Sequence, residues 1–251
     1  MPIVGRAASR RPTQRLLAIA AVCAAAWPFA SSAQPFADAR ARLVREIEET
    51  VRATERYTGI AQLDGAVLEA IATVPRHEFV PEPLRGNASL NRPLPIGFDQ
   101  TISQPYIVAL MTALARVDGD SVVLEIGTGS GYQAAVLGEL ARDVYTIEIV
   151  EPLGRRAAAT LERLGYENVH GRIGDGYAGW PEHAPFDAIV VTAAPEHVPQ
   201  PLIEQLASGG RLVIPVGSQR ASQTLEVHEK TSDGEIVRTE VLPVAFVPLT
   251  R

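Results

Sequence analysis

Three glycines lie close together at 125–131, where the sequence reads E-I-G-T-G-S-G. This run follows an apolar stretch at 122–126 and precedes a predicted helix at 131–141, so it forms a turn between a strand and a helix. Glycine tolerates sharp turns and lets a ligand approach the backbone, because it has no Cβ. We therefore predict a cofactor-binding loop formed by Glu125, Gly127, Gly129 and Gly131.

The spacing of the glycines indicates which ligand the loop binds. A dinucleotide fingerprint has the form G-x-G-x-x-G, whereas here the third glycine comes one residue early and is followed by Tyr132. The form G-x-G-x-G is typical of class I S-adenosylmethionine methyltransferases, whose methionyl group carries no pyrophosphate. A nucleotide-dependent enzyme and a purely structural turn are the alternatives.

Acidic residues follow the next two predicted strands. Glu148 ends the strand at 144–148, where a carboxylate can accept hydrogen bonds from both ribose hydroxyls of an adenosyl group. Asp175 and Gly176 follow the strand at 169–173, and we expect this side chain or an adjacent amide to bind the adenine. A simple Asx-turn at Asp175 is the alternative.

These residues need a scaffold that brings strand ends together, and the pattern from 119 onward predicts one. Short apolar strands alternate with helices, which indicates a mostly parallel sheet covered on both faces. The remaining predicted strands are at 187–192 and 211–216, and the helices at 151–164 and 199–206. Two further strands, 224–229 and 236–244, flank an Asp-Gly turn and predict an antiparallel hairpin at the sheet edge.

Two helices are expected before the sheet. Apolar residues recur every four positions between 36 and 59, and Asp64 is a good N-cap for a short helix ending at 73. The stretch 81–105 is rich in proline, glycine and asparagine and predicts an ordered, functional loop. We expect one domain at 34–251, with a helical cap and substrate loop at 34–118 and a cofactor-binding sheet at 119–251.

The first 33 residues have the three parts of a secretory signal peptide. Four arginines precede an uncharged run at 16–26, and the small residues at 30–33 suggest cleavage after Ala33. The run is shorter than the roughly 20 residues that span a bilayer. We predict a periplasmic protein, and Arg10-Arg11 also resembles a twin-arginine signal. A helix of the folded domain or a misassigned start, with a cytoplasmic protein, is the alternative.

The composition and charge of the chain limit which binding partners are expected. The chain has 251 residues, 46% hydrophobic and 21% charged, which is typical of a soluble globular domain. Its formal net charge of −6 becomes more negative without the arginine-containing leader, so neither nucleic acid nor a membrane surface is expected as a partner. Cys23, the single cysteine, lies in the leader, which excludes disulfides and thiolate metal sites from the mature chain. The five histidines show no metal-ligand spacing.

The segment at 96–109, I-G-F-D-Q-T-I-S-Q-P-Y-I-V-A, is more specific than the glycine loop. It resembles the hallmark segment of the protein-L-isoaspartate O-methyltransferase family. The stretches 74–81, 175–181, 186–195, 209–217 and 243–249 resemble this family too, so the resemblance covers about 43–251. Asp99 departs from the glycine that is commoner at this position, and we expect an altered local turn with activity retained.

The resemblance implies methyl transfer from S-adenosylmethionine to the free carboxylate of L-isoaspartyl, and of D-aspartyl, residues in damaged proteins. It implies that Ser103 is the active-site serine and that Thr101 and Ile102 line the cleft. A carboxylate is ionised at neutral pH and needs no general base, so Ser103 would orient the carboxylate. A serine-hydrolase role is excluded because no G-x-S-x-G surrounds Ser103. A helix N-cap at 103–105 is the structural alternative.

Other functions remain open at this point. The chain is expected to act as a monomer, and another carboxyl methyltransferase would fit the same motifs. A nucleotide-dependent oxidoreductase fits the sheet but not the glycine spacing. A non-catalytic, exported protein-binding module is the third alternative, because the leader points outside the cytoplasm whereas the cofactor is made inside it.

Overall fold

The computed structural model describes residues 1–2, 34–218 and 222–251. The chain divides into two units, Met1–Ser31 and Ser32–Arg251, and every helix and strand reported below belongs to the second. The sequence features of the predicted leader lie at 3–33, outside the described residues. Secretion therefore stays a prediction.

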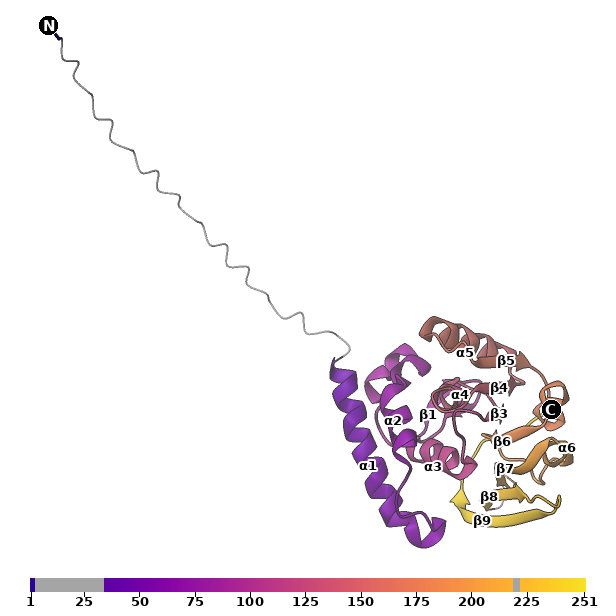
Figure 1. Ribbon diagram of the computed structural model, residues 1–251. Helices are drawn as coiled ribbons and strands as arrows, with labels where there is room; N and C mark the ends of the chain where they lie inside the picture. The colour runs from indigo at the N-terminus through magenta and orange to yellow at the C-terminus, as the bar shows by residue number, and fades with distance from the viewer. Residues whose placement is uncertain (3–33, 219–221) are drawn as a thin grey trace. The chain divides into compact units, whose positions relative to one another are not determined.

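A seven-stranded sheet forms the centre of the second unit (Figure 1). Its spatial order is β5-β4-β3-β6-β7-β8-β9, parallel from β5 to β7 and antiparallel at β8 and β9. The strands are β3 Val122–Ile126, β4 Asp143–Glu148, β5 Val169–Ile173, β6 Phe186–Val191, β7 Leu206–Val216, β8 Gln223–Lys230 and β9 Ile236–Val244. The predicted mostly parallel sheet with a C-terminal hairpin is confirmed.

The strand order reverses at β3, because the chain runs outward to β5 and then returns to β6 on the other side of β3. In open sheets of this kind, ligands bind beside the carboxyl ends of the strands at the point of reversal. The glycine loop at 127–131 begins directly after β3, at this point.

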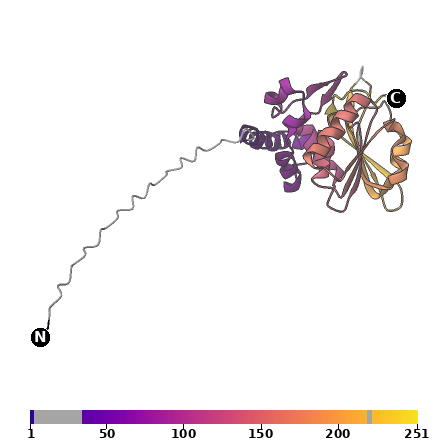
Figure 2. The same cartoon turned by 90° about the horizontal axis from the view of Figure 1, so that it is seen from above.

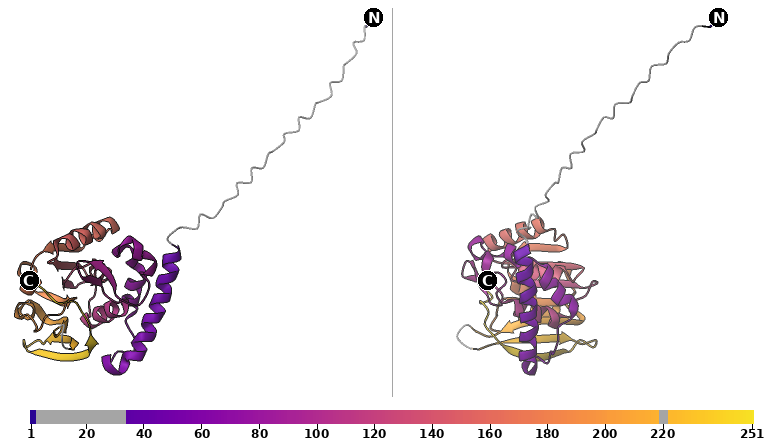
Figure 3. Two further views of the ribbon diagram at one scale, coloured as in Figure 1. Left: turned by 180° about the vertical axis from the view of Figure 1, so that it is seen from behind. Right: turned by 90° about the vertical axis from the view of Figure 1, so that its left-hand side faces the viewer.

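Helices cover both faces of the sheet (Figure 2). One face packs Val123, Val144 and Val190 against helices of the first half of the domain, and the other packs Leu124 and Ile189 beneath α6. The helices are α1 Gln34–Thr58, α2 Gly65–Thr73, α3 Pro105–Ala115, α4 Tyr132–Gly138, α5 Glu151–Leu164 and α6 Gln200–Glu204. Figure 3 shows α5 and the β8–β9 hairpin at opposite ends of the sheet.

The two predicted N-terminal helices are present. The helix α1 buries Leu43, Ile47 and Val51, the apolar positions of its predicted inner face. The helix α2 begins after Asp64, whose Oδ1 accepts a hydrogen bond from the backbone N of Ala66 at 2.8 Å. This side-chain cap satisfies one of the amides that a helix start leaves without a partner.

The loop at 81–105 contains more regular structure than predicted. A 3₁₀ helix, η2 Glu82–Asn87, precedes two short antiparallel strands, β1 Leu94–Gly97 and β2 Gln100–Ile102. The turn between the strands is made by Phe98 and Asp99, both with a φ of 55°. Strands this short display too few alternating residues for a periodic pattern to be visible in the sequence.

Candidate active site

The glycine loop turns sharply at the carboxyl end of β3. Gly127, Gly129 and Gly131 have φ values of 96°, 53° and 90°, a region that side chains rarely adopt. The amides of Gly127 and Thr128 both donate to the carbonyl oxygen of Ile147, at 2.8 and 3.2 Å, which ties the loop to β4. A Cβ on Gly127 would lie 2.6 Å from Oγ1 of Thr192, so the loop also packs against the end of β6.

Glu148, the last residue of β4, is held against this loop. Its Oε2 accepts from the backbone N of Gly129 at 2.7 Å and its Oε1 accepts from the backbone N of Val150 at 2.8 Å. The residue is 6% exposed. Because each carboxylate oxygen has more than one acceptor position, the fixed carboxylate can still accept further hydrogen bonds from a ligand.

Glu125 lies beneath the loop rather than in the crevice. Its side chain is fully buried, and its Oε2 accepts from Oγ1 of Thr146 at 2.5 Å, whereas Oε1 has no partner within the described part of the chain. Burial raises the pKa of Glu125 to about 8, an effect that the Thr146 hydrogen bond opposes and the nearby charge of Glu148 adds to. At neutral pH Glu125 is therefore mainly protonated.

One crevice collects half of the predicted site residues. It is lined by residues from the ends of β2, β3, β4 and β6 and from the C-terminal segment, among them Thr101, Gly127, Gly129, Glu148, Gly176, Thr192 and Leu249. Glu125, Ile102, Gly131 and Asp175 do not line it. Ile102 is buried in the core, and the Cα of Gly131 faces α5, where a Cβ would lie 3.3 Å from Cβ of Ala157.

Asp175 makes the local turn that was the structural alternative for it. Its Oδ1 accepts from the backbone N of Tyr177 at 2.9 Å and caps the short 3₁₀ helix η3 Gly176–Ala178. Its neighbour Gly176 does reach the crevice, and a Cβ there would lie 2.4 Å from Cγ2 of Ile126. The Asp175 side chain thus shapes the crevice wall that Gly176 forms.

Ser103 lines a groove that adjoins the crevice, and the two share Thr101, Thr192 and Val247. Their volumes are about 50 and 550 Å³, so together they fall within the range of about 300–1,000 Å³ that is usual for ligand sites. The helix start that was the structural alternative at 103–105 is present, but Ser103 does not cap it. The N-cap of α3 is Gln104, followed by Pro105, and no side chain caps this helix start.

The hydroxyl of Ser103 accepts or donates no hydrogen bond among residues 34–218 and 222–251, whereas its carbonyl oxygen accepts from Arg76 at 2.9 Å. The side chain is half-buried at the wall of the groove. A fixed backbone with a free hydroxyl is suited to holding an incoming polar group.

Two parts of the crevice were not among the predicted site residues. Thr192 donates from Oγ1 to the carbonyl oxygen of Gly127 at 2.6 Å. The C-terminal segment 247–250 crosses the end of β6, where the amide of Ala194 donates to Val247 and that of Leu249 donates to Ala194, at 2.8 and 3.0 Å. The only sequence signal for this segment was its membership in the family-like stretch 243–249.

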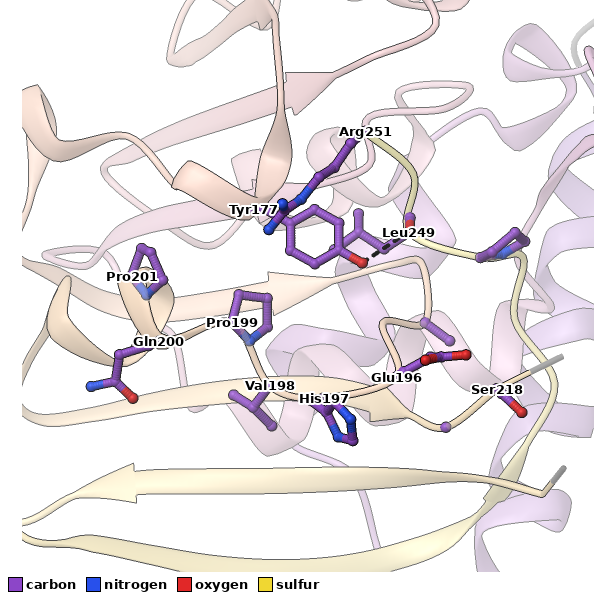
Figure 4. A pocket seen from close by; sticks show the side chains of 13 residues that line it. Tyr177, Glu196, His197, Val198, Pro199, Gln200, Pro201, Ser218, Leu249 and Arg251 are labelled. Carbon is purple, nitrogen blue, oxygen red and sulfur yellow. Dashed lines mark hydrogen bonds between the residues drawn. The ribbon is translucent and has the colours of Figure 1, made fainter.

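A larger cavity of about 780 Å³, drawn in Figure 4, shares Pro248 and Leu249 with the crevice. Its wall includes Tyr177, His197, Ser218 and Leu249, and the Tyr177 hydroxyl donates to the Leu249 carbonyl oxygen at 3.1 Å. None of the predicted site residues lines it. The larger volume of this cavity is therefore no reason to place the cofactor in it. The groups suited to a cofactor line the smaller crevice.

No cluster of three or more histidine, cysteine, aspartate or glutamate side chains that could hold a metal ion occurs in the described ranges. Four of the histidines there, His77, His170, His183 and His228, have other contacts. His228, for example, contacts Glu226 at 2.8 Å, and His183 stacks on Tyr145 with ring centroids 3.9 Å apart.

The sheet order, the glycine loop and the strand-end glutamate define a class I S-adenosylmethionine-dependent methyltransferase fold. Comparison with known proteins is more specific. The family model for protein-L-isoaspartate(D-aspartate) O-methyltransferase matches residues 46–251, and the chain belongs to that family.

Curated relatives match this chain over nearly their whole length. Protein-L-isoaspartate O-methyltransferase 2 of Syntrophobacter fumaroxidans is 56% identical over 243 residues, which are 96% of this chain and 98% of that protein. The protein of the same name from a Polaromonas species is 60% identical over 208 residues, 83% of this chain and 99% of that protein. The family expected from the segment at 96–109 is confirmed, and the oxidoreductase alternative is wrong.

Solved structures share the fold. A protein-L-isoaspartate O-methyltransferase superposes with a TM-score of 0.73 at 28% identity, covering 84% of this chain and 66% of that chain. A Plasmodium falciparum protein, described as a putative enzyme of the same family in complex with S-adenosyl-L-homocysteine, gives a TM-score of 0.68 at 22% identity. The match covers 86% of this chain and 98% of that chain, and supports the fold.

Proposed function

We propose that this chain transfers the methyl group of S-adenosylmethionine to the free carboxylate of L-isoaspartyl, and of D-aspartyl, residues in damaged proteins. One observation carries the proposal. The crevice formed by the glycine loop and Glu148 adjoins the groove that contains the free hydroxyl of Ser103, with Thr101 and Thr192 common to both. The names of the relatives point to the same reaction.

The residues of the crevice fit this cofactor. When bound, S-adenosylmethionine supplies an electrophilic methyl group on its sulfonium sulfur. Glu148 offers a carboxylate that two backbone amides hold in place, which suits ribose hydroxyls. Gly127 and Gly129 present backbone without side chains, and Gly176 does the same from the turn after β5.

The groove fits a carboxylate on a polypeptide. An aspartyl-type carboxylate has a pKa near 4 and is already a nucleophilic anion at neutral pH, so the site needs no base. Ser103 donates its hydroxyl hydrogen to that anion and fixes its direction, and such positioning can contribute about 7–11 kcal/mol to a two-substrate reaction. Ile107 and Val247, which line the groove, limit the access of water.

A pair of peptides tests the proposal. One carries an isoaspartyl residue and its twin carries aspartate at the same position, and both are incubated with the protein and labelled S-adenosylmethionine. We expect rapid labelling of the isoaspartyl peptide and little of the twin. Equal labelling of both, or labelling of an unrelated acceptor alone, would contradict the assignment. Calorimetry that detects no cofactor binding would instead favour a non-catalytic module.

We also propose that the protein is exported to the periplasm and works there as a monomer without a nucleic-acid or membrane partner. The arginine-rich leader supports export, and the acidic balance of the remaining chain disfavours a nucleic-acid or anionic membrane partner. Among the described residues, no helix has the length and apolar character to cross a bilayer. Mass spectrometry of the natural protein should find Gln34 as its first residue, and a chain starting at Met1 or Pro2 would refute cleavage.

A further inference from the structure

Arg76 is a buried cation outside the crevice and the groove. It begins the 3₁₀ helix η1 Arg76–Phe79 and is 1% exposed. Its Nη1 donates to the carbonyl oxygen of Ala88 at 2.5 Å, and its Nη2 donates to those of Ser103 and Arg92 at 2.9 and 3.3 Å. No ion pair in the described part of the chain includes Arg76. The guanidinium group therefore interacts with backbone carbonyl groups and not with a carboxylate.

The carbonyl groups that Nη2 binds stand at the two ends of one hairpin. Arg92 precedes β1 and Ser103 follows β2, so a single nitrogen holds the base of the hairpin together. Asn91 adds a second link, because its Oδ1 accepts from the backbone N of Tyr106 at 3.0 Å. The hairpin contributes Gln100 and Thr101 to the crevice, and its base contributes Ser103 to the groove.

Arg76 also packs against α4, the helix that follows the glycine loop. Its guanidinium carbon lies 5.6 Å from the ring centroid of Tyr132, a separation at which a cation and an aromatic ring attract. Tyr132 is the first residue of α4, directly after the glycine loop. Burial lowers the pKa of Arg76 to about 10, so the guanidinium stays charged at neutral pH and its hydrogen bonds are charge-assisted.

We infer that Arg76 is a positioning residue for methyl transfer, which fixes the backbone of Ser103 and thereby aims the Ser103 hydroxyl into the groove. The inference rests on the proposed function and extends it. Arg76 itself lines neither cavity, so it acts through Ser103. A lysine cannot replace it fully, because one ammonium group does not reproduce the planar fork that reaches separate oxygens.

Kinetics of three variants of the full chain test the inference. R76M removes the donors, R76K keeps a charge, and R211M is the matched control. Arg211 also donates to a backbone carbonyl, that of Leu114 at 3.2 Å, and its side chain is 13% exposed. It differs from Arg76 in pairing with Glu229 as well, and it lines neither the crevice nor the groove. For each variant the melting temperature, the Kd for S-adenosylmethionine, and kcat and KM for an isoaspartyl peptide are measured.

We expect R76M to lower kcat/KM for the peptide about 10- to 100-fold, because a small displacement of an orienting group costs that much, and to leave the cofactor Kd nearly unchanged. R76K should recover part of the loss. R211M should lower the melting temperature without lowering kcat/KM at temperatures where the protein is folded. A folded R76M with wild-type kcat/KM would overturn the inference, as would an equal loss of activity in R211M.

Hydrogen exchange supplies a readout that does not depend on the acceptor. R76M, or R76K if R76M does not fold, should exchange faster at 100–106 and unchanged at 122–131. Unchanged exchange at 100–106 would overturn the inference. A wild-type protein that methylates no isoaspartyl peptide would refute the proposed function instead, while the exchange result would still show whether Arg76 orders the Ser103 segment.

Discussion

Ser103 has the two properties that an orienting group needs. Its carbonyl oxygen is held by Arg76, which fixes the backbone, while its hydroxyl is free of hydrogen bonds within the described chain. Sequence resemblance could indicate the residue, but it could not show this division between a fixed main chain and a free side chain. Because the hydroxyl makes no hydrogen bond among the described residues, Ser103 can be substituted without disturbing the fold.

Replacement of Ser103 by alanine should therefore reduce catalysis more than stability. A hydrogen bond to a charged group contributes about 1.5–3 kcal/mol, which corresponds to a loss of about 10- to 150-fold in kcat/KM. The melting temperature should hardly change, because no native hydrogen bond is removed. Steady-state kinetics on an isoaspartyl peptide measure the effect, and S103T, which keeps a hydroxyl, is the control. Full activity in S103A would remove the orienting role.

Glu125 should make stability depend on pH. Burial raises its pKa from 4.5 to about 8 in the folded protein, so between these values the unfolded chain has released a proton that the folded chain still holds. Stability should therefore fall as the pH rises from about 4.5 to about 8 and level off above. The slope is up to about 1.4 kcal/mol per pH unit within that window.

The E125Q variant tests this pH dependence, because glutamine is similar in shape and does not titrate. Denaturant unfolding at pH 5.5 and pH 8 should show that the wild type loses more stability than E125Q between the two conditions. Parallel losses in both proteins would mean that Glu125 does not titrate in this window.

At the level of elements, the hairpin β1–β2 carries a strained turn. Phe98 and Asp99 both have a φ of 55°, where a residue with a Cβ costs about 1–2 kcal/mol and glycine costs little. The sequence led us to expect an altered turn at Asp99. In the structure Asp99 has the left-handed conformation that glycine would favour. D99G should be more stable than D99A by about 1 kcal/mol, since only alanine retains the Cβ. Equal unfolding free energies for the two variants would contradict the strain.

Elements with strong local signals were predicted well. The bounds of β3, α5 and β5 match the predictions, because apolar periodicity and helix-end residues mark them. The strand β7 begins at Leu206 rather than 211, because Gly209 and Gly210 look like a loop in sequence. In the fold, a Cβ on Gly210 would lie 2.9 Å from a carbonyl oxygen, so glycine is required for close pairing there.

The helix α4 ends at Gly138 rather than at the predicted 141. Glycine is a poor helix former, and a Cβ at this position would lie only 3.1 Å from Cγ2 of Val169 on β5. The helix therefore ends where Gly138 packs closely against β5, a strand that lies far away in the sequence. Local periodicity carries no information on such a contact.

At the scale of the whole molecule, the site is assembled from distant parts of the chain. The N-terminal cap holds the Ser103 segment through Arg76 and through a hydrogen bond of 2.7 Å between the hydroxyls of Thr54 and Tyr106. The glycine loop and Glu148 come from the middle, and Val247 comes from the end. The sequence indicated the central part, because motifs are local. It could not indicate that the C-terminal segment lines the crevice or that Glu125 lies beneath it, since tertiary packing decides both.

The position of the transferred methyl group tests the central claim most directly. A single peptide that contains an isoaspartyl residue, an ordinary aspartyl residue and a free C-terminus is incubated with the protein and S-adenosylmethionine, and tandem mass spectrometry locates the added methyl group. We predict one methyl group, on the free carboxylate of the isoaspartyl residue. A methyl group on the ordinary aspartyl side chain or on the C-terminus would contradict the account, because the groove beside Ser103 would then select a different carboxylate.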